Sequence, residues 1–300
     1  LIIIVLVRNS KPGRVETKRH PVLVSISQGK VEGMTLISRL GIEYFGFKGI
    51  RYAQVPLRFA SPERADNWEG VFYANKTASP CFQFRGTDQR FIGIEDCLTL
   101  DIYTPKLEGN LPVAFWIHSG GFQMGTGTVF EGKYFADASV VLVTINYRLG
   151  ALGFLNTEDG QVLGNMCLKD QVKAMEWVRD NIRHFGGDPA KVMLFGNSAG
   201  GSSDLFSTGY SQWNALNPWA FQRNPRKNAI AFAKHAGCAA KNRTTNLDVA
   251  CLRSKNATEL AIAQLKLKTL PIQFDLLNMV FCPSAESPKM GNDSFLTDSP

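Results

Sequence analysis

Residues 190–201 read AKVMLFGNSAGG, and this stretch decides the fold. Its first part, residues 190–196, is a near-continuous apolar run, which is typical of a strand covered on both faces of a parallel sheet. Ser198 follows the run directly and stands between Gly196 and Gly200 in a G-x-S-x-G pattern. Because glycine has no Cβ, the turn can be sharp and the backbones can come close. The pattern predicts a nucleophile elbow, with the serine hydroxyl at the C-terminal edge of a sheet, rather than an ordinary turn.

The segments before this stretch predict two more buried strands and a helix. LPVAFWIH at residues 111–118 and VVLVTINY at residues 140–147 are apolar runs of the same kind. Residues 168–185 carry apolar side chains at steps of three and four, the period of an amphipathic helix, which is predicted to stop at Gly186-Gly187. Strand, helix and strand in this order form a right-handed βαβ unit, so the sequence predicts an α/β fold.

The remaining segments are shorter or more broken. Residues 21–60 predict short strands joined by turns, and residues 98–105 alternate apolar with polar side chains as a strand does. Residues 232–267 predict helical pieces, and the chain after residue 270 is punctuated by proline and glycine as a loop is.

A second motif follows the strand predicted at residues 111–118. HSGGFQMGTG at residues 118–127 places Gly120 beside Gly121, so two backbone N–H groups can point at one position. Acyl transfer creates an oxyanion, which preorganised N–H donors must stabilise, and the N–H of Ala199 is predicted to point to the same place. A phosphate-binding loop is the alternative, but the stretch lacks the lysine and the spacing of a P-loop. Together the two motifs predict a serine hydrolase that acts by acyl transfer.

The overall composition is that of a folded globular protein. The chain has 300 residues, of which 44% are hydrophobic and 20% charged, enough for one large domain or two ordinary ones. The net charge is +7, yet the basic residues are spread along the chain, without the run or aromatic-interleaved stripe of a nucleic-acid interface. A solvated basic surface is therefore expected, and no nucleic-acid partner.

The first seven residues, LIIIVLV, are apolar. They are too few to span a bilayer, which takes about 20 residues, so no stable membrane insertion is expected. The end of a signal peptide is favoured over a buried first strand. The expected domains are a signal remnant with an N-terminal arm at residues 1–20 and an incomplete α/β domain at residues 21–300.

Cysteines and glycosylation sequons point to an oxidising compartment. There is no C-x-x-C and no Cys/His cluster, so neither a metal nor another cofactor is expected. Of the six cysteines, Cys81 and Cys97 close one short polar segment, and Cys238 and Cys251 close another, which suits two local disulfides. N-x-S/T sequons occur at four asparagines, Asn75, Asn242, Asn256 and Asn292. Together with the apolar start, these features predict a secreted glycoprotein.

Beyond these motifs, long stretches of the chain resemble the type-B carboxylesterase/cholinesterase family, and insect esterases in particular. The matching stretches are FKGIRYA, LRFASPE, EDCLTLDIYTP, WIHSGGF, VVLVTINYRLGALGFL, LKDQVKAMEWVRDNIRHFGGDPAKVMLFGNSAGG, LNPWA and the GCAA…ACLR pair. The resemblance implies an α/β-hydrolase fold with a mostly parallel central sheet and helices on both faces. It implies hydrolysis of a small carboxylic ester, with Ser198 as nucleophile and Gly120, Gly121 and Ala199 as oxyanion donors. It also implies the disulfides Cys81–Cys97 and Cys238–Cys251, and leaves Cys167 and Cys282 unpaired.

The chain departs from the family pattern in its catalytic partners. The family's acid and histidine lie far downstream of the serine, and this chain ends before either. None of its four histidines, His20, His118, His184 and His235, stands in the context of the family's catalytic histidine. Glu286 matches a family position upstream of the triad acid and is therefore not expected to be that acid. The 300 residues are therefore expected to be inactive or nearly so, because a serine without its base is a poor nucleophile.

Other departures lie closer to Ser198. After GNSAGGSS the helix expected in the family is almost absent, which should expose apolar strand surface, and we hypothesise an incomplete or mis-spliced gene product. Asn197 stands where the family usually has glutamate. The segment between Cys81 and Cys97 contains no tryptophan, so a choline ester is not the expected substrate. A non-catalytic adhesion protein on the same fold is the rival hypothesis, which the retained Ser198 and glycines disfavour.

Overall fold

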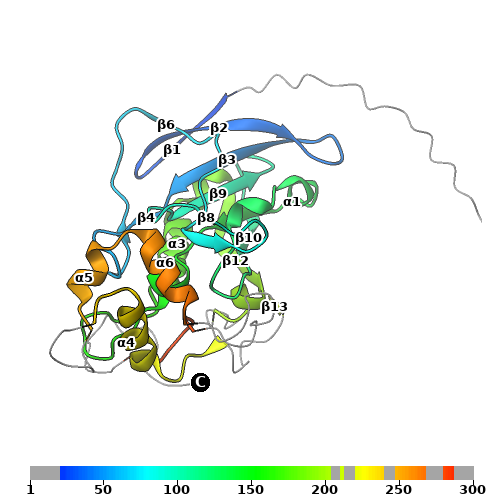
Figure 1. Ribbon diagram of the computed structural model, residues 1–300. Helices are drawn as coiled ribbons and strands as arrows, with labels where there is room; N and C mark the ends of the chain where they lie inside the picture. Colours follow the sequence, from blue (N-terminus) through cyan, green and yellow to red (C-terminus); the bar gives the residue numbers. More distant parts are fainter. Residues whose placement is uncertain (1–20, 204–209, 213–219, 240–246, 268–279, 287–300) are drawn as a thin grey trace, which may run out of the picture.

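The computed structural model describes residues 21–203, 210–212, 220–239, 247–267 and 280–286 (Figure 1). The predicted signal remnant and N-terminal arm, residues 1–20, lie outside this part of the chain. Within it, nine strands form one mixed sheet in the order β1-β2-β3-β9-β11-β10-β12-β13, with β6 paired to β2.

The first half of the sheet is antiparallel. Its strands are β1 (Pro21–Ile26), β2 (Gly29–Ile37), β3 (Glu43–Arg51) and β9 (Thr99–Thr104). The short β6 (Val71–Tyr73) adds in parallel to β2. These bounds confirm the strands predicted within residues 21–60 and 98–105.

The second half of the sheet is parallel and carries the sequence motifs. Its strands are β11 (Val141–Ile145), β10 (Leu111–Ile117), β12 (Gly187–Asn197) and β13 (Tyr210–Gln212). Strand β10 lies between β11 and β12, so the loops that follow β10 and β12 leave the same edge of the sheet.

Helices lie on both faces of this sheet. On one face, α3 (Met166–Asn181) continues as a 3₁₀ turn, Ile182–Phe185, which confirms the predicted amphipathic helix and its end before Gly186-Gly187. The buried side chains of α3 join the large core with Phe115 and Val143 of the sheet. On the other face, α1 (Lys133–Asp137) contributes Ala136 to a smaller core. We call these the α3 face and the α1 face.

The smaller core on the α1 face leaves part of β12 uncovered. Its buried members are Tyr44, Tyr103, Ala114, Ala136 and Leu142. Met193 of β12 is 50% exposed, and Phe195 is only partly buried. The prediction that this strand is covered on both faces is therefore wrong for β12, although β11 is buried throughout. The physical reason is that apolar side chains show only that a strand is suited to burial. Whether it is buried depends on a second element, from elsewhere in the chain, that packs over it.

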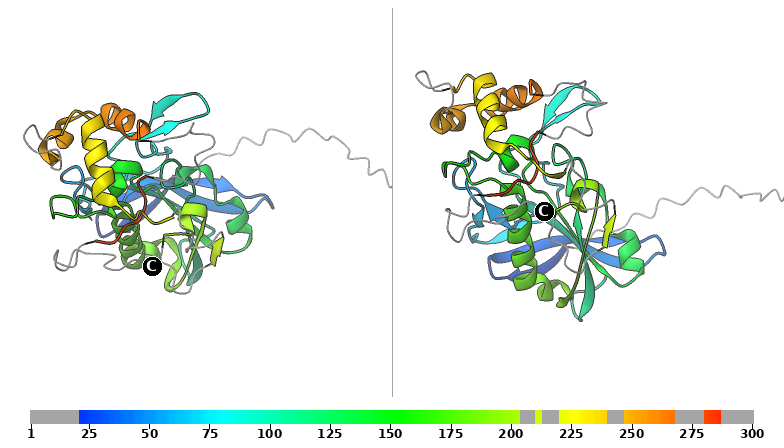
Figure 2. Two further views of the ribbon diagram at one scale, coloured as in Figure 1. Left: turned by 60° about the horizontal axis from the view of Figure 1, so that its bottom comes forward. Right: turned by 90° about the horizontal axis from the view of Figure 1, so that it is seen from below.

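A second group of helices lies at one end of the molecule, beside the hairpin of β7 (Gln83–Arg85) and β8 (Arg90–Ile92) (Figure 2). These helices are α4 (Pro225–His235), α5 (Val249–Ser254) and α6 (Ala257–Leu265). Helices α5 and α6 confirm the helical pieces predicted at residues 232–267, whereas α4 begins seven residues before that range. The remaining short elements are β4 (Ala53–Gln54), β5 (Glu63–Arg64), α2 (Gly150–Phe154) and the 3₁₀ turns Gly127–Val129 and Ser198–Gly200. Among the described residues, no helix is both long and apolar enough to cross a bilayer.

Candidate active site

Ser198 occupies a strained turn directly after β12. Its φ is +55°, in the left-handed region that few residues other than glycine adopt. Asn197 before it is still extended, and the chain then makes a single 3₁₀ turn, in which Ser202 N–H donates to Ser198 O at 2.9 Å. Backbone strain of this kind is concentrated at functional sites, where the surrounding structure holds it in place.

The two glycines beside Ser198 allow the turn to pack against β10. A Cβ on Gly196 would lie 2.4 Å from the carbonyl carbon of Gly200, and a Cβ on Gly200 would lie 2.1 Å from Ile117 O. Both contacts are with backbone, so neither can be relieved by turning a side chain. The glycines of the G-x-S-x-G pattern are therefore required by close approach, and that approach brings the serine turn to the end of β10.

The loop after β10 has an unusual run of left-handed residues. Gly120, Gly121 and Phe122 have φ of 127°, 60° and 59°. The loop folds back on itself, since Gln123 N–H and Met124 N–H both donate to Gly120 O, at 3.0 and 3.1 Å. Among the backbone hydrogen bonds of the described residues, the N–H groups of Gly120 and Gly121 donate to no carbonyl. In the part of the chain that the structure describes, these two adjacent N–H groups therefore have no backbone acceptor.

Phe122 anchors this loop to the core. Its side chain is fully buried and meets Phe154 edge-on, with ring centroids 5.1 Å apart. Its carbonyl accepts from Gly150 N–H at 2.7 Å. The loop is therefore attached both to its own strand and to the start of α2.

His118, the residue that follows β10, packs beneath the glycine loop on the core side. Its ring is buried, stacks on Tyr147 with centroids 4.0 Å apart, and has Nδ1 2.8 Å from Ser119 O. Burial lowers the pKa of His118 to about 4, against a partial opposite effect of the Ser119 carbonyl. The ring is neutral at pH 7 and poorly suited to take up the proton of a serine hydroxyl. It acts instead as packing beneath the oxyanion motif.

The other histidines give no base for Ser198 either. His184 and His235 are exposed, and His20 lies outside the described residues. Within the part of the chain that the structure describes, no hydrogen bond joins a histidine to Ser198. The structure thus brings Ser198, Ala199, Gly120 and Gly121 to one edge of the sheet, without a described histidine beside them.

Several residues that support the site were not predicted from the sequence. Arg148 donates to both carboxylate oxygens of Asp170, at 2.8 and 2.6 Å, and this buried pair fixes the chain after β11 onto α3. Glu286 is buried, accepts from Asn165 at 2.7 Å and pairs with Lys169 at 3.2 Å. The charges come from segments far apart in the sequence, and no local spacing marks them.

The described residues contain two disulfides. They join Cys81 to Cys97 and Cys238 to Cys251, the pairs that the resemblance implies, while Cys167 and Cys282 are buried and belong to neither disulfide. Arg58 connects the two disulfide loops. Its guanidinium donates to Glu95 at 2.7 Å and to carbonyls at the end of α5, including Arg253 O at 2.8 Å.

Of the four predicted glycosylation asparagines, two are exposed and two lie outside the described residues. Asn75 and Asn256 are exposed, and Asn256 also caps α6 by accepting from Glu259 N–H at 2.8 Å. Asn242 and Asn292 lie outside the described residues. Among the residues that are described, no group of three His, Cys, Asp or Glu side chains could hold a metal ion.

The mixed sheet, the strained serine turn and the glycine loop beside it define an α/β-hydrolase. More specifically, the chain belongs to the carboxylesterase family, whose profile matches residues 20–300. It is similar to a carboxylic ester hydrolase of Bombus ignitus, with 38% identity over 92% of this chain and 52% of the relative. It is 40% identical to a juvenile hormone esterase of Tribolium castaneum, over 82% of this chain and 45% of the relative. It is 32% identical to esterase P of Drosophila melanogaster, over 95% of this chain and 55% of the relative. The chain thus spans about half the length of the curated relatives it matches.

Proposed function

We propose that the protein hydrolyses small carboxylic esters through an acyl-enzyme formed on Ser198. The observation that carries this proposal is the contact between the two loops. Gly200, two residues after Ser198, approaches Ile117 so closely that a Cβ would lie 2.1 Å from Ile117 O, three residues before Gly120. This packing brings a strained serine and two adjacent backbone donors to the same edge of the sheet.

The proposed roles follow from that geometry. Ser198 Oγ attacks the ester carbonyl, and the N–H groups of Gly120, Gly121 and Ala199 stabilise the oxyanion that forms. An activated serine also requires a general base and an acid to orient it. We place both outside these 300 residues, because the buried His118 is neutral and the exposed His184 and His235 make no contact with Ser198 in the described structure. The 300-residue chain alone should therefore react slowly or not at all.

Fluorophosphonate labelling tests the assignment of Ser198. The transcript would first be sequenced through and past the codon for Pro300, and the longer protein compared with the 300-residue chain and with Ser198→Ala in each. We expect esterase-like labelling and hydrolysis of a p-nitrophenyl ester only by the longer protein, and neither by its Ser198→Ala variant. Fast labelling of Ser198 in the 300-residue chain would show that a base lies within it. Ester hydrolysis that survives Ser198→Ala would overturn the proposal.

We also propose that the protein is a secreted glycoprotein whose catalytic domain begins near residue 21. Two disulfides and two exposed sequon asparagines, Asn75 and Asn256, support this. Expression in insect cells tests it, because a secreted protein accumulates in the medium and shifts in mass when its N-glycans are removed enzymatically. Retention in the cytosol without a mass shift would contradict the proposal.

A further inference from the structure

Gln83 binds the glycine loop on one flank. Its side chain comes from β7 and is 7% exposed. The amide oxygen accepts from Gly125 N–H at 2.8 Å, while the amide nitrogen donates to Gly125 O at 2.8 Å and to Cys81 O at 2.9 Å. An amide that pairs with both backbone groups of one residue fixes that residue in position and in orientation.

Fixing Gly125 also fixes the start of the loop. Gly125 has a φ of 122°, and a Cβ on it would lie 2.3 Å from Ser119 O. The loop therefore closes into a ring whose ends, Ser119 and Gly125, are in backbone contact. Gln83 binds this ring at Gly125, where its two ends meet.

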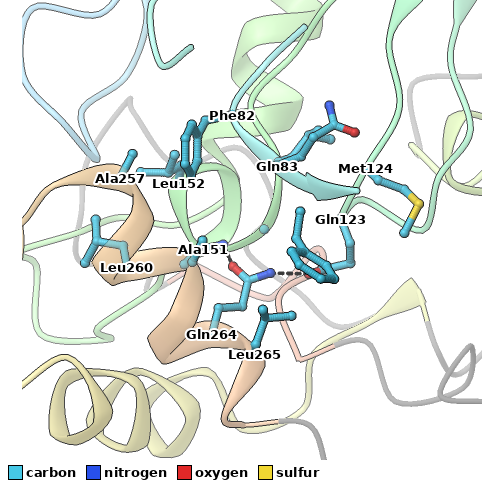
Figure 3. A pocket seen from close by; sticks show the side chains of 14 residues that line it. Phe82, Gln83, Gln123, Met124, Ala151, Leu152, Ala257, Leu260, Gln264 and Leu265 are labelled. Atoms are coloured by element: carbon cyan, nitrogen blue, oxygen red, sulfur yellow. Dashed lines mark hydrogen bonds between the residues drawn. The ribbon is translucent and has the colours of Figure 1, made fainter. Parts of the chain in front are cut away.

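Gln264 binds the same loop at a second point. It projects from α6 into a pocket between that helix, the β7–β8 hairpin and the glycine loop (Figure 3). Its amide oxygen accepts from Ala151 N–H at 2.8 Å, and its amide nitrogen donates to Gln123 Oε1 at 2.5 Å. Gln123 in turn donates to Phe281 O at 2.6 Å.

The orientation of both amides is determined by their backbone partners. Ala151 can only donate at its N–H, so Gln264 presents its oxygen there and its NH₂ group toward Gln123. Phe281 can only accept at its carbonyl, so Gln123 presents its NH₂ group there and its oxygen toward Gln264. In the chain of hydrogen bonds from Ala151 to Phe281, the donor and the acceptor of every bond are therefore fixed.

The surroundings make these bonds costly to break. The pocket is lined mostly by apolar side chains, which are Phe82, Phe84, Met124, Leu149, Leu152, Leu260 and Leu265. Gln83 is buried there, whereas Gln123 and Gln264 are partly buried, so an amide group that loses its partner has limited access to water in compensation. Between these two amide contacts, the carbonyls of Gly120 and Phe122 accept from Gln123, Met124 and Gly150. The loop is held at Gly120, Phe122, Gln123 and Gly125, while the N–H groups of Gly120 and Gly121 donate to no carbonyl among the described residues.

We propose that Gln83 and Gln264, the latter acting through Gln123, are positioning residues that hold the Gly120–Gly125 loop in the geometry for oxyanion binding. We call these three side chains the amide clamp. The inference rests on the proposed ester hydrolysis, because the oxyanion of that reaction needs N–H donors at a fixed place. Preorganised donors stabilise an oxyanion without reorganising during the reaction, so a looser loop lowers turnover more than substrate affinity.

Hydrogen exchange tests the clamp without requiring any reaction at Ser198. Exchange in the peptide covering residues 119–126 would be measured for Gln264→Met, Gln123→Met, their combination, Gln83→Met and the exposed-turn control Gln161→Met. Loss of one clamp bond should speed exchange there about fivefold to tenfold while exchange in α3 stays unchanged. The double variant should exchange faster than either single variant but by less than the product of the two single effects, because the bond between Gln264 and Gln123 is counted in both single variants, whereas the bonds to Ala151 and Phe281 are not shared. Unchanged exchange, or fully additive effects, would overturn the clamp.

Kinetics on the longer protein separate the clamp from the proposed function. Gln264→Met and Gln83→Met should lower kcat about tenfold with KM nearly unchanged, and Gln161→Met should change neither. If Gln264→Met fails to fold, Gln264→Glu replaces it, because the carboxylate still accepts from Ala151 N–H but donates nothing to Gln123. Faster exchange in a protein without esterase activity would support a positioned loop and refute ester hydrolysis. Esterase activity with equal losses in kcat for Gln264→Met and Gln161→Met would refute the clamp alone.

Discussion

The two faces of β10 differ in how well they are covered. Phe115 points to the α3 face and is fully buried, whereas its neighbour Trp116 points to the α1 face and is partly exposed. The same contrast is present on β12, where Leu194 packs against the large core and Met193 is 50% exposed. Successive side chains of a strand alternate between faces, so adjacent residues sample two different environments.

The difference shows which part of the fold is specified locally. The α3 face is covered by helix α3, which lies between β11 and β12 in the sequence. The βαβ unit therefore contains the helix that buries this face of its strands. The α1 face has α1 over part of the sheet, and the 3₁₀ turn after Ser198 is a single turn. Substitutions at matched positions on the two faces should therefore differ in cost.

Phe115→Ala and Trp116→Ala give the largest expected contrast. Phe115→Ala should lower the free energy of unfolding by about 4 kcal/mol, because it leaves a cavity in a closed core. Trp116→Ala should lower it by about 2 kcal/mol, because part of the indole is already in water. Urea denaturation followed by circular dichroism would measure both. Equal losses would mean that the α1 face is as closed as the α3 face.

Asp101, which lies on the α1 face of the sheet, should make the free energy of unfolding depend on pH. Desolvation raises the pKa of Asp101 to about 6, although Gly49 N–H, Lys48 and the hydroxyl of Tyr103 oppose the shift. Between about pH 4 and 6 the native state keeps a proton that the unfolded state has lost, so the free energy of unfolding falls as pH rises through this window. Asp101→Asn should remove a decline on the order of 2 kcal/mol.

Denaturation curves at pH 4, 5, 6 and 7 would check this prediction. The difference between the native protein and Asp101→Asn isolates the contribution of this carboxyl from those of exposed acids. A difference that is constant across the four pH values would show that Asp101 titrates alike in the folded and unfolded chains.

A smaller effect is expected at the indole nitrogen of Trp116. Among the described residues, Trp116 Nε1 is buried and has no hydrogen-bond partner. Trp116→Phe removes this donor together with its desolvation penalty, so the loss of apolar contact and the gain should cancel to within about 1 kcal/mol. The Tm measured by calorimetry should stay nearly constant. A large drop in Tm would indicate that Nε1 has a partner outside the described residues.

Met193→Ser should have the smallest effect of all. The side chain is half in water, so the free energy of unfolding should change by about 0.5 kcal/mol or less, whereas Leu194→Ser on the α3 face should cost about 2 kcal/mol. Chemical denaturation of the two variants gives the comparison. If Met193→Ser costs as much as Leu194→Ser, then Met193 is covered in solution.

The sequence predicted the elements that its local patterns encode. Apolar runs gave β10, β11 and β12, the three- and four-residue period gave α3, and glycine spacing located the two loops. Partners that come from distant segments could not be predicted, because nothing near Gly120 indicates that Gln83 and Gln264 will bind its loop. The burial that neutralises His118 also depends on Tyr147, 29 residues away. The exposure of Met193 agrees with the expectation that the short segment after Ser198 leaves apolar strand surface exposed, although the apolar run of β12 by itself predicted cover on both faces.

Arg58 has a consequence for the chemistry of the disulfides. Its guanidinium holds Glu95, two residues before Cys97, and also the carbonyl end of α5, the helix that contains Cys251. The two covalent loops, far apart in the sequence, therefore meet at one cation. Reduction of Cys238–Cys251 would loosen the α5 carbonyls that fix Arg58, and with them the ion pair beside Cys97. We therefore expect that a reductant which opens one bridge makes the other easier to open.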